Sequence, residues 1–187
     1  MSFHFKCKNK PQKGLFLEDK DLEKVVVERF NQAKRYVFVG WRFTGHGHHV
    51  WQEIHEKWPE KDIFLIEIFK KNCDDLERME VPFVKVILGD VRKYREIFQP
   101  KKGDFLVWQH GPEHISLEEA EKTVGEMKED FDAIFLETPY GSYPQGAMYG
   151  NIHETHISLW KEGEYHNLGF RTSRTTETYI AGYWEKH

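Results

Sequence analysis

Cysteine is scarce in this sequence, and so are long apolar runs. Only Cys7 and Cys73 occur among 187 residues, far apart and with no C-x-x-C pair. Neither a disulfide framework nor a cysteine zinc site is therefore indicated, although one disulfide stays compatible with the sequence. The most apolar stretches, such as DIFLIEIF (62–69), are too short to cross a bilayer, and the opening MSFHFKCKNK has no hydrophobic signal core. We expect a soluble, cytoplasmic protein.

A strong excess of charge of one sign is also missing. Lys and Arg number 27 and Asp and Glu number 31, which gives a formal net charge of −4. This balance does not indicate a nucleic-acid partner. No repeat, low-complexity segment or linker divides the chain, so we expect a single domain over 1–187, with 1–34 as an N-terminal extension and helix that packs on it. The oligomeric state is not indicated.

Five short apolar segments are present, and helical patterns lie between them. The segments alternate little between apolar and polar residues, as in strands covered on both faces. They are YVFVGW (36–41), DIFLIEIF (62–69), PFVKVILGD (82–90), DFLVWQ (104–109) and DAIFLE (132–137).

The helical patterns and the chain end complete a predicted fold. Ser116 and Glu119 form an S-x-x-E capping box that marks the start of a helix after the fourth segment. Alternation of strands and helices predicts an α/β fold with a parallel, doubly wound sheet. The ending FRTSRTTETYIAGYWEKH (170–187) predicts an antiparallel hairpin at one sheet edge. Apolar residues at helical spacing are Leu22, Val25, Val26, Phe30 and Ala33; Val50, Trp51, Ile54 and Trp58; and Leu117, Ala120, Val124 and Met127.

Ligands of parallel sheets bind beyond the carboxyl ends of the strands, so the residues there are candidates for a binding site. Gly40 and Gly45 lie in the turn after the first segment, where glycine lets the main chain approach a ligand. The second strand is expected to end with Glu67, within the segment 62–69, where the carboxylate can accept hydrogen bonds from ribose hydroxyls; the alternatives are a solvated acid or an acid paired with Lys70. Asp90 closes the third segment as an adenine acceptor or, alternatively, a turn residue or helix cap.

The most polar strand end follows the fourth segment, at QHGPEH. His110, Glu113 and His114 are expected at the mouth of the crevice, available to a substrate, unless they form an ordinary surface loop. The long stretch after the fifth segment mixes aromatic and polar residues, which is typical of binding loops. Its candidate residues for substrate binding are Tyr140, Gln145, Tyr149 and His156.

Taken together, DFLVWQHGPEH…EEAEK, ETPYGSYPQGAMYGN, HETHISLW and NLGF resemble the class I S-adenosylmethionine-dependent methyltransferases. The resemblance is closest to a bacterial and phage-type group with an HGPEH-like turn, and it runs from about residue 34 to the C-terminus. It implies a Rossmann-like three-layer sandwich with a mostly parallel seven-stranded sheet and a C-terminal antiparallel hairpin. It also implies S-adenosylmethionine as cofactor and methyl transfer to an acceptor, for which a small molecule is our expectation.

Methyl transfer requires the acceptor's proton to be removed where it has one, and imidazole titrates near neutral pH. His114, or His110 in its place, is therefore the candidate base, Glu113 orients it or binds substrate, and His156 is a second candidate base. The resemblance assigns roles to further residues. The remaining implied contacts are Gly40 and Gly45 with the methionine part of the cofactor, Glu67 with the ribose, Asp90 with the adenine, and Trp108 to His114 around the activated methyl group.

Alternatives remain at this point. The family usually has an acid near the end of the first strand, where this chain has Phe38 and Val39, so a non-catalytic module that binds the cofactor or a partner stays open. Another alternative is a metal-dependent hydrolase with ligands among His110, Glu113, His114, His153 and His156, or a metal site in the GHGHH tract (45–49). We expect no metal, because Pro112 keeps His110 and His114 off one regular helical face and no HExxH motif is present.

Overall fold

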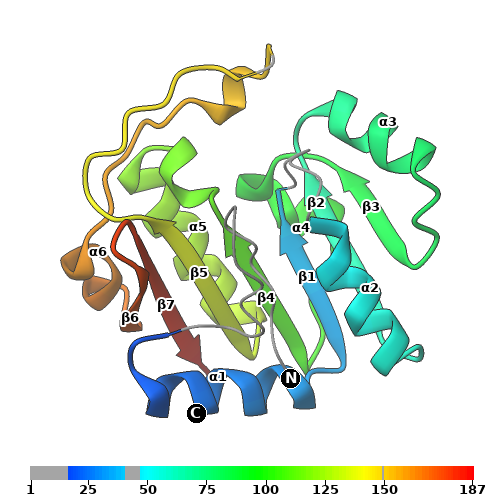
Figure 1. Cartoon of the computed structure of the whole chain (residues 1–187), viewed down its shortest axis with the longest axis horizontal. Helices are drawn as coiled ribbons and strands as arrows, with labels where there is room; N and C mark the ends of the chain where they lie inside the picture. The colour runs from blue at the N-terminus through cyan, green and yellow to red at the C-terminus, as the bar shows by residue number, and fades with distance from the viewer. Residues whose placement is uncertain (1–16, 41–46, 149) are drawn as a thin grey trace.

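The computed structural model describes residues 17–40, 47–148 and 150–187, apart from the side chains of 47–49. Its core is a seven-stranded sheet in the order β3-β2-β1-β4-β5-β7-β6 (Figure 1). The first five strands are parallel, and β7 runs antiparallel to both β5 and β6. The predicted mostly parallel sheet with a C-terminal hairpin is confirmed. The strands are β1 (Arg35–Val39), β2 (Asp62–Glu67), β3 (Val84–Leu88), β4 (Asp104–Gln109), β5 (Ala133–Pro139), β6 (Arg171–Thr176) and β7 (Tyr179–Glu185).

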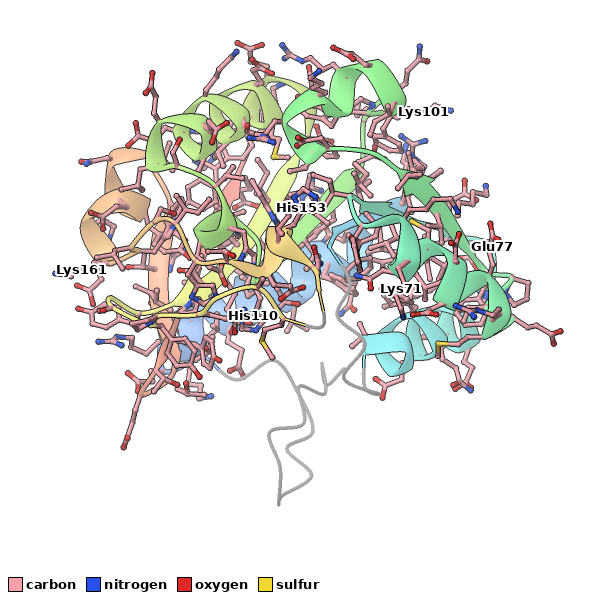
Figure 2. The ribbon with its side chains drawn as sticks, turned by 90° about the horizontal axis from the view of Figure 1, so that it is seen from above. Lys71, Glu77, Lys101, His110, His153 and Lys161 are labelled. Carbon is pink, nitrogen blue, oxygen red and sulfur yellow. The ribbon has the colours of Figure 1, made fainter. Side chains whose placement is uncertain are left out.

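Helices cover both faces of the sheet and make three layers (Figures 1 and 2). Buried side chains of α1, α2 and α3 pack in one hydrophobic core, and those of α4, α5 and α6 pack in the other. The α-helices are α1 (Lys20–Gln32), α2 (Gly47–Lys57), α3 (Lys70–Arg78), α4 (Tyr94–Ile97), α5 (Leu117–Asp130) and α6 (Glu162–Asn167), and the short 3-10 helices are η1 (Val91–Lys93), η2 (Pro112–His114) and η3 (Ile152–Glu154).

The helix boundaries follow from capping. Asp19 caps α1 by accepting hydrogen bonds from the main-chain N–H groups of Asp21 and Leu22. The capping box of Ser116 and Glu119 is present at the start of α5, as predicted. None of the helices in the described ranges combines the length and apolarity that a membrane span requires.

The second strand ends at Glu67, as predicted, and the Glu67 carboxylate accepts the N–H of Phe69 at 2.7 Å. The third strand differs from the prediction. The third strand lies at the sheet edge and is not covered on both faces: Lys85 is exposed and Leu88 is 50% exposed. Cys73 is a buried free thiol in α3, and Cys7 lies outside the described residues.

Candidate functional site

The register of the parallel strands brings the predicted strand-end residues to one edge of the sheet. Val39 of β1 is paired with Ile66 of β2 and with Trp108 of β4. Each of these paired residues is followed by a candidate or its neighbour: Glu67 on β2, Gly40 after β1 and Gln109 on β4. Because the three strands are adjacent, these residues lie side by side at the edge. Figure 2 looks onto this edge and shows His110 and His153 well inside the outline of the molecule.

Gly40 makes the turn that leaves β1. Its φ of +74° lies in the left-handed region, which glycine adopts without a steric penalty. Its N–H donates to the carbonyl of Ile66 at 2.9 Å. Phe38 and Val39 before it are buried and apolar, so the strand carries no acid here. Gly45 lies outside the described residues.

Glu67 places a buried carboxylate at the carboxyl end of β2. The residue is 3% exposed, and its Oε1 accepts the hydrogen bond from Phe69 that ends the strand. Lys70, the alternative partner considered from the sequence, forms its ion pair with Asp74 at 2.5 Å. Glu67 is therefore held by the main chain at the position where a ribose-binding acid was predicted.

Asp90 has the capping geometry that the sequence left open for it. Its Oδ1 accepts the main-chain N–H of Arg92 at 2.9 Å at the start of η1, and the Arg92 guanidinium also contacts both carboxylate oxygens. Burial opposes ionisation of this carboxyl, but the bonds from Arg92 outweigh it and hold the pKa of Asp90 below its usual value. An adenine contact at Asp90 stays a prediction.

Trp108 lies in the hydrophobic core beneath the turn that follows β4. It is 2% exposed, and a Cβ atom on Gly111 would lie only 2.0 Å from its Nε1. The next residue but one, His110, has a φ of +50° and donates its N–H to the carbonyl of Glu137 at 2.8 Å. The indole therefore supports the turn from below, and its contact with a cofactor stays a prediction.

Glu113 was expected at the mouth of a crevice, and this expectation is wrong. Glu113 is 2% exposed, because the segment after η3 folds over it. The main-chain carbonyl of Glu113 accepts hydrogen bonds from the N–H groups of Ile157 at 2.8 Å and Ser158 at 3.1 Å. Neither carboxylate oxygen of Glu113 has a hydrogen-bond partner in the described part of the chain. Burial, reinforced by the charges of Glu137 and Glu154, raises the pKa of Glu113 to about 8.

Three histidines surround this carboxylate. His156 Nε2 lies 3.9 Å from Glu113 Oε1, and His110 Nδ1 lies 4.0 Å from the same oxygen. The rings of His114 and His156 are 4.9 Å apart. Burial lowers the pKa of His114, whereas the side chain of His110 is 48% exposed. His153 is exposed and is not part of the group formed by Glu113, His114 and His156.

The predicted substrate residues are distributed along the loop after β5. Tyr140 lies under the guanidinium of Arg174, which is 3.2 Å from the ring centroid. Gln145 shapes the loop through two hydrogen bonds. Its side-chain Nε2 donates to the main-chain carbonyl of Glu154, and its main-chain carbonyl accepts from the N–H of His156. Tyr149 lies outside the described residues. Of these side chains, His156 is the one that reaches the Glu113 carboxylate.

Two residues at this edge were not predicted. Glu137, on β5, is 7% exposed; its Oε2 accepts from Gln109 at 2.7 Å and lies 3.7 Å from His110 Nε2. Tyr179 begins β7 opposite Pro139, and its ring is 4.9 Å from that of His110. The rule about strand ends would have found Glu137 on β5. Finding Tyr179 required the knowledge that β7 pairs antiparallel with β5, which brings its amino end to the same edge.

Searches of protein-family models and of curated proteins found no match to the sequence. Solved structures do match. The N-terminal domain of EvdMO1 with SAH bound has a TM-score of 0.61 at 16% identity, covering 100% of this chain and 91% of that one. PigF with SAH has a TM-score of 0.57 at 15% identity and covers 84% of this chain. Human N-acetylserotonin methyltransferase with SAM has a TM-score of 0.58 at 13% identity and covers 87% of this chain.

The chain spans about half the length of two of these relatives, 52% of PigF and 51% of the human enzyme. At these identities the likeness concerns the fold. The chain has the Rossmann-like fold of the class I methyltransferases, with five parallel strands followed by the antiparallel hairpin.

Proposed function

We propose that the protein is an S-adenosylmethionine-dependent methyltransferase that acts on a small-molecule acceptor. The observation that carries the proposal is the buried carboxylate of Glu67 at the carboxyl end of β2, one strand from Gly40 and two strands from the turn at His110. The fold supports it, because similar structures contain SAM or SAH at low sequence identity. The same fold gives no support to a hydrolase.

The residues at this edge offer suitable groups to such a cofactor. Neighbouring strands are about 5 Å apart, so the end of β2 lies about 10 Å from the end of β4, and a ribose at β2 would place the adjoining sulfonium toward β4. Glu67 is the proposed acceptor for the ribose hydroxyls, at about 1.5–3 kcal/mol for each charge-assisted bond. The other proposed contacts are Gly40 and Gly45 with the methionine part, Asp90 with the adenine, and Trp108 beneath the methyl-bearing end.

When bound, S-adenosylmethionine supplies a methyl carbon already activated by its sulfonium, so the chain has to place the acceptor and take its proton. His110 is the better exposed of the two candidate bases, and Glu137 lies close enough to its Nε2 to orient the ring. His114 is the second candidate, and the buried Glu113 would orient it. Tyr140, Gln145, Tyr149 and His156 are the proposed residues on the acceptor side.

The ribose role is tested by Glu67→Gln, which keeps an oxygen for the Phe69 N–H and removes the charge. We expect the dissociation constant for SAH, measured by calorimetry, to rise tenfold or more, the equivalent of about 1.4 kcal/mol. Glu77→Gln, which makes the same change at an exposed glutamate of α3, is the matched control and should bind like the wild type. An unchanged constant in a folded Glu67→Gln variant would contradict the proposal.

Catalysis is tested separately by following SAH release when wild-type protein and SAM are incubated with fractionated small-molecule extracts. Transfer in one fraction, and its loss when His110 and His114 are both replaced by Ala, is the expected result. Cofactor binding with no transfer in any small-molecule, protein or nucleic-acid fraction would contradict the enzyme and support a binding module.

A further inference from the structure

We propose that Glu113, His114 and His156 together bind a divalent transition metal ion, and that zinc is the ion this ligand set fits best. Each residue offers one ligand atom, and these atoms lie within 4.8 Å of one another. Two of the residues are in η2, and the third comes from the segment after η3 that folds over it. The site is proposed from its own geometry and does not depend on methyl transfer.

The two histidines are oriented as metal ligands usually are. Nδ1 of His114 lies 3.2 Å from the carbonyl oxygen of Thr155, and Nδ1 of His156 lies 2.6 Å from that of Tyr143. A carbonyl only accepts, so Nδ1 is the donor in each of these two contacts, and Nε2 is the nitrogen that a neutral ring offers to a metal; the His114 ring also interacts with the main chain of His110. Metal-ligating histidines characteristically donate their other ring N–H to such a second partner, which fixes the tautomer and the ring orientation.

The carboxylate of Glu113 is an independent indication of a bound cation. Its side chain is 3% exposed, and both oxygens lack a hydrogen-bond partner within the residues that the structure describes. A buried carboxylate without a partner is costly, and proteins pair such a group, use it as a metal ligand or leave it protonated, which is the state that the raised pKa of Glu113 favours without a cation. A cation between Glu113 and the two imidazoles offsets this cost directly.

Binding of a tetrahedral ion requires the three ligand atoms to move closer together. Tetrahedral ligands with bonds of about 2.0–2.1 Å lie about 3.3 Å apart. Nε2 of His156 and Oε1 of Glu113 are 3.9 Å apart and need to approach by about 0.6 Å, and a pair at the 4.8 Å limit of the group needs to approach by about 1.5 Å. Two imidazoles and one carboxylate are a ligand set suited to zinc, and three protein ligands leave a fourth position open. With His114 on the metal, the proposed base role falls to His110.

Zinc binding is tested on full-length protein that has been treated with a chelator and dialysed. Calorimetric titration with zinc chloride should show one ion per chain. Glu113→Gln and His156→Gln should each weaken binding at least tenfold, with wild-type circular dichroism. His153→Gln is the matched control, because His153 lies in η3, three residues before His156, is exposed and is not part of the group. This variant should bind zinc like the wild type.

A competing location is the GHGHH tract, whose three histidines the variant H46Q/H48Q/H49Q removes. Zinc binding that is lost in H46Q/H48Q/H49Q and unchanged in Glu113→Gln would overturn the proposal, as would a wild-type protein that binds no zinc. Should the site variants fail to fold, histidine modification of the wild type decides. Zinc should protect His114 and His156 from diethyl pyrocarbonate and leave His153 reactive, and equal reactivity with and without zinc would reject the site. SAH binding to the metal-free protein, measured in parallel, tests the methyltransferase proposal separately.

Discussion

Replacing Gly111 by Ala tests whether the indole of Trp108 holds the turn from Gly111 to His114. A Cβ atom at this position would lie 2.0 Å from Nε1 and 2.5 Å from Cδ1 of Trp108. An ordinary contact begins at 3.4 Å, so the indole or the turn has to move by about 1.4 Å. Trp108 is 2% exposed in a packed core, which has no empty volume to receive it. We expect a loss of about 1–3 kcal/mol in the free energy of unfolding, as for other overpacked cores.

The assay is thermal and urea unfolding followed by circular dichroism. For a chain of this size each kcal/mol corresponds to a change of about 2–4 °C in the unfolding midpoint. Gly125→Ala is the control, because nothing lies within 4 Å of its added Cβ atom in the middle of α5. That variant should gain about 0.5–1 kcal/mol through helix propensity. A Gly111→Ala protein as stable as the wild type would refute the packing argument.

Two further predictions concern groups away from the candidate site. Asp104 is fully buried and accepts two hydrogen bonds from Arg35, at 2.6 and 2.5 Å, so Asp104→Asn should lower the free energy of unfolding in urea by about 3–5 kcal/mol. Asp62→Asn, at the exposed ion pair with Lys85, should lower it by less than about 1 kcal/mol, and equal losses would contradict the burial argument. Burial raises the pKa of the Cys73 thiol to about 11, so only about one molecule in a thousand carries the thiolate at about pH 8. In a Cys7→Ser protein this thiol should therefore react with a disulfide reagent only after denaturant is added, and rapid labelling of the folded protein would contradict the prediction.

The strands were predictable because both faces of most of them are buried. Such strands appear in the sequence as short apolar runs, and β4 was predicted with its observed bounds, Asp104–Gln109. The end of β2 at Glu67 was predicted as well, within an apolar run that continues through Phe69. The exposed face of β3 was missed, because an edge position is a property of the whole sheet and is absent from the local pattern.

The candidate site was only partly predictable. Strand ends at one edge follow from topology, so Gly40, Glu67 and the turn at His110 could be placed together from the sequence. The burial of Glu113 could not, because it depends on Ile157 and Ser158, more than forty positions later, folding back onto its carbonyl. A glutamate between proline and histidine looks like a surface residue until that long-range contact is known.

The most direct test of the account is a crystal structure of the protein grown with SAH. The account predicts the ribose hydroxyls within hydrogen-bonding distance of the Glu67 carboxylate and the sulfur directed toward the turn at His110 to His114. SAH bound at another edge of the sheet, or a ribose that makes no contact with Glu67, would contradict it.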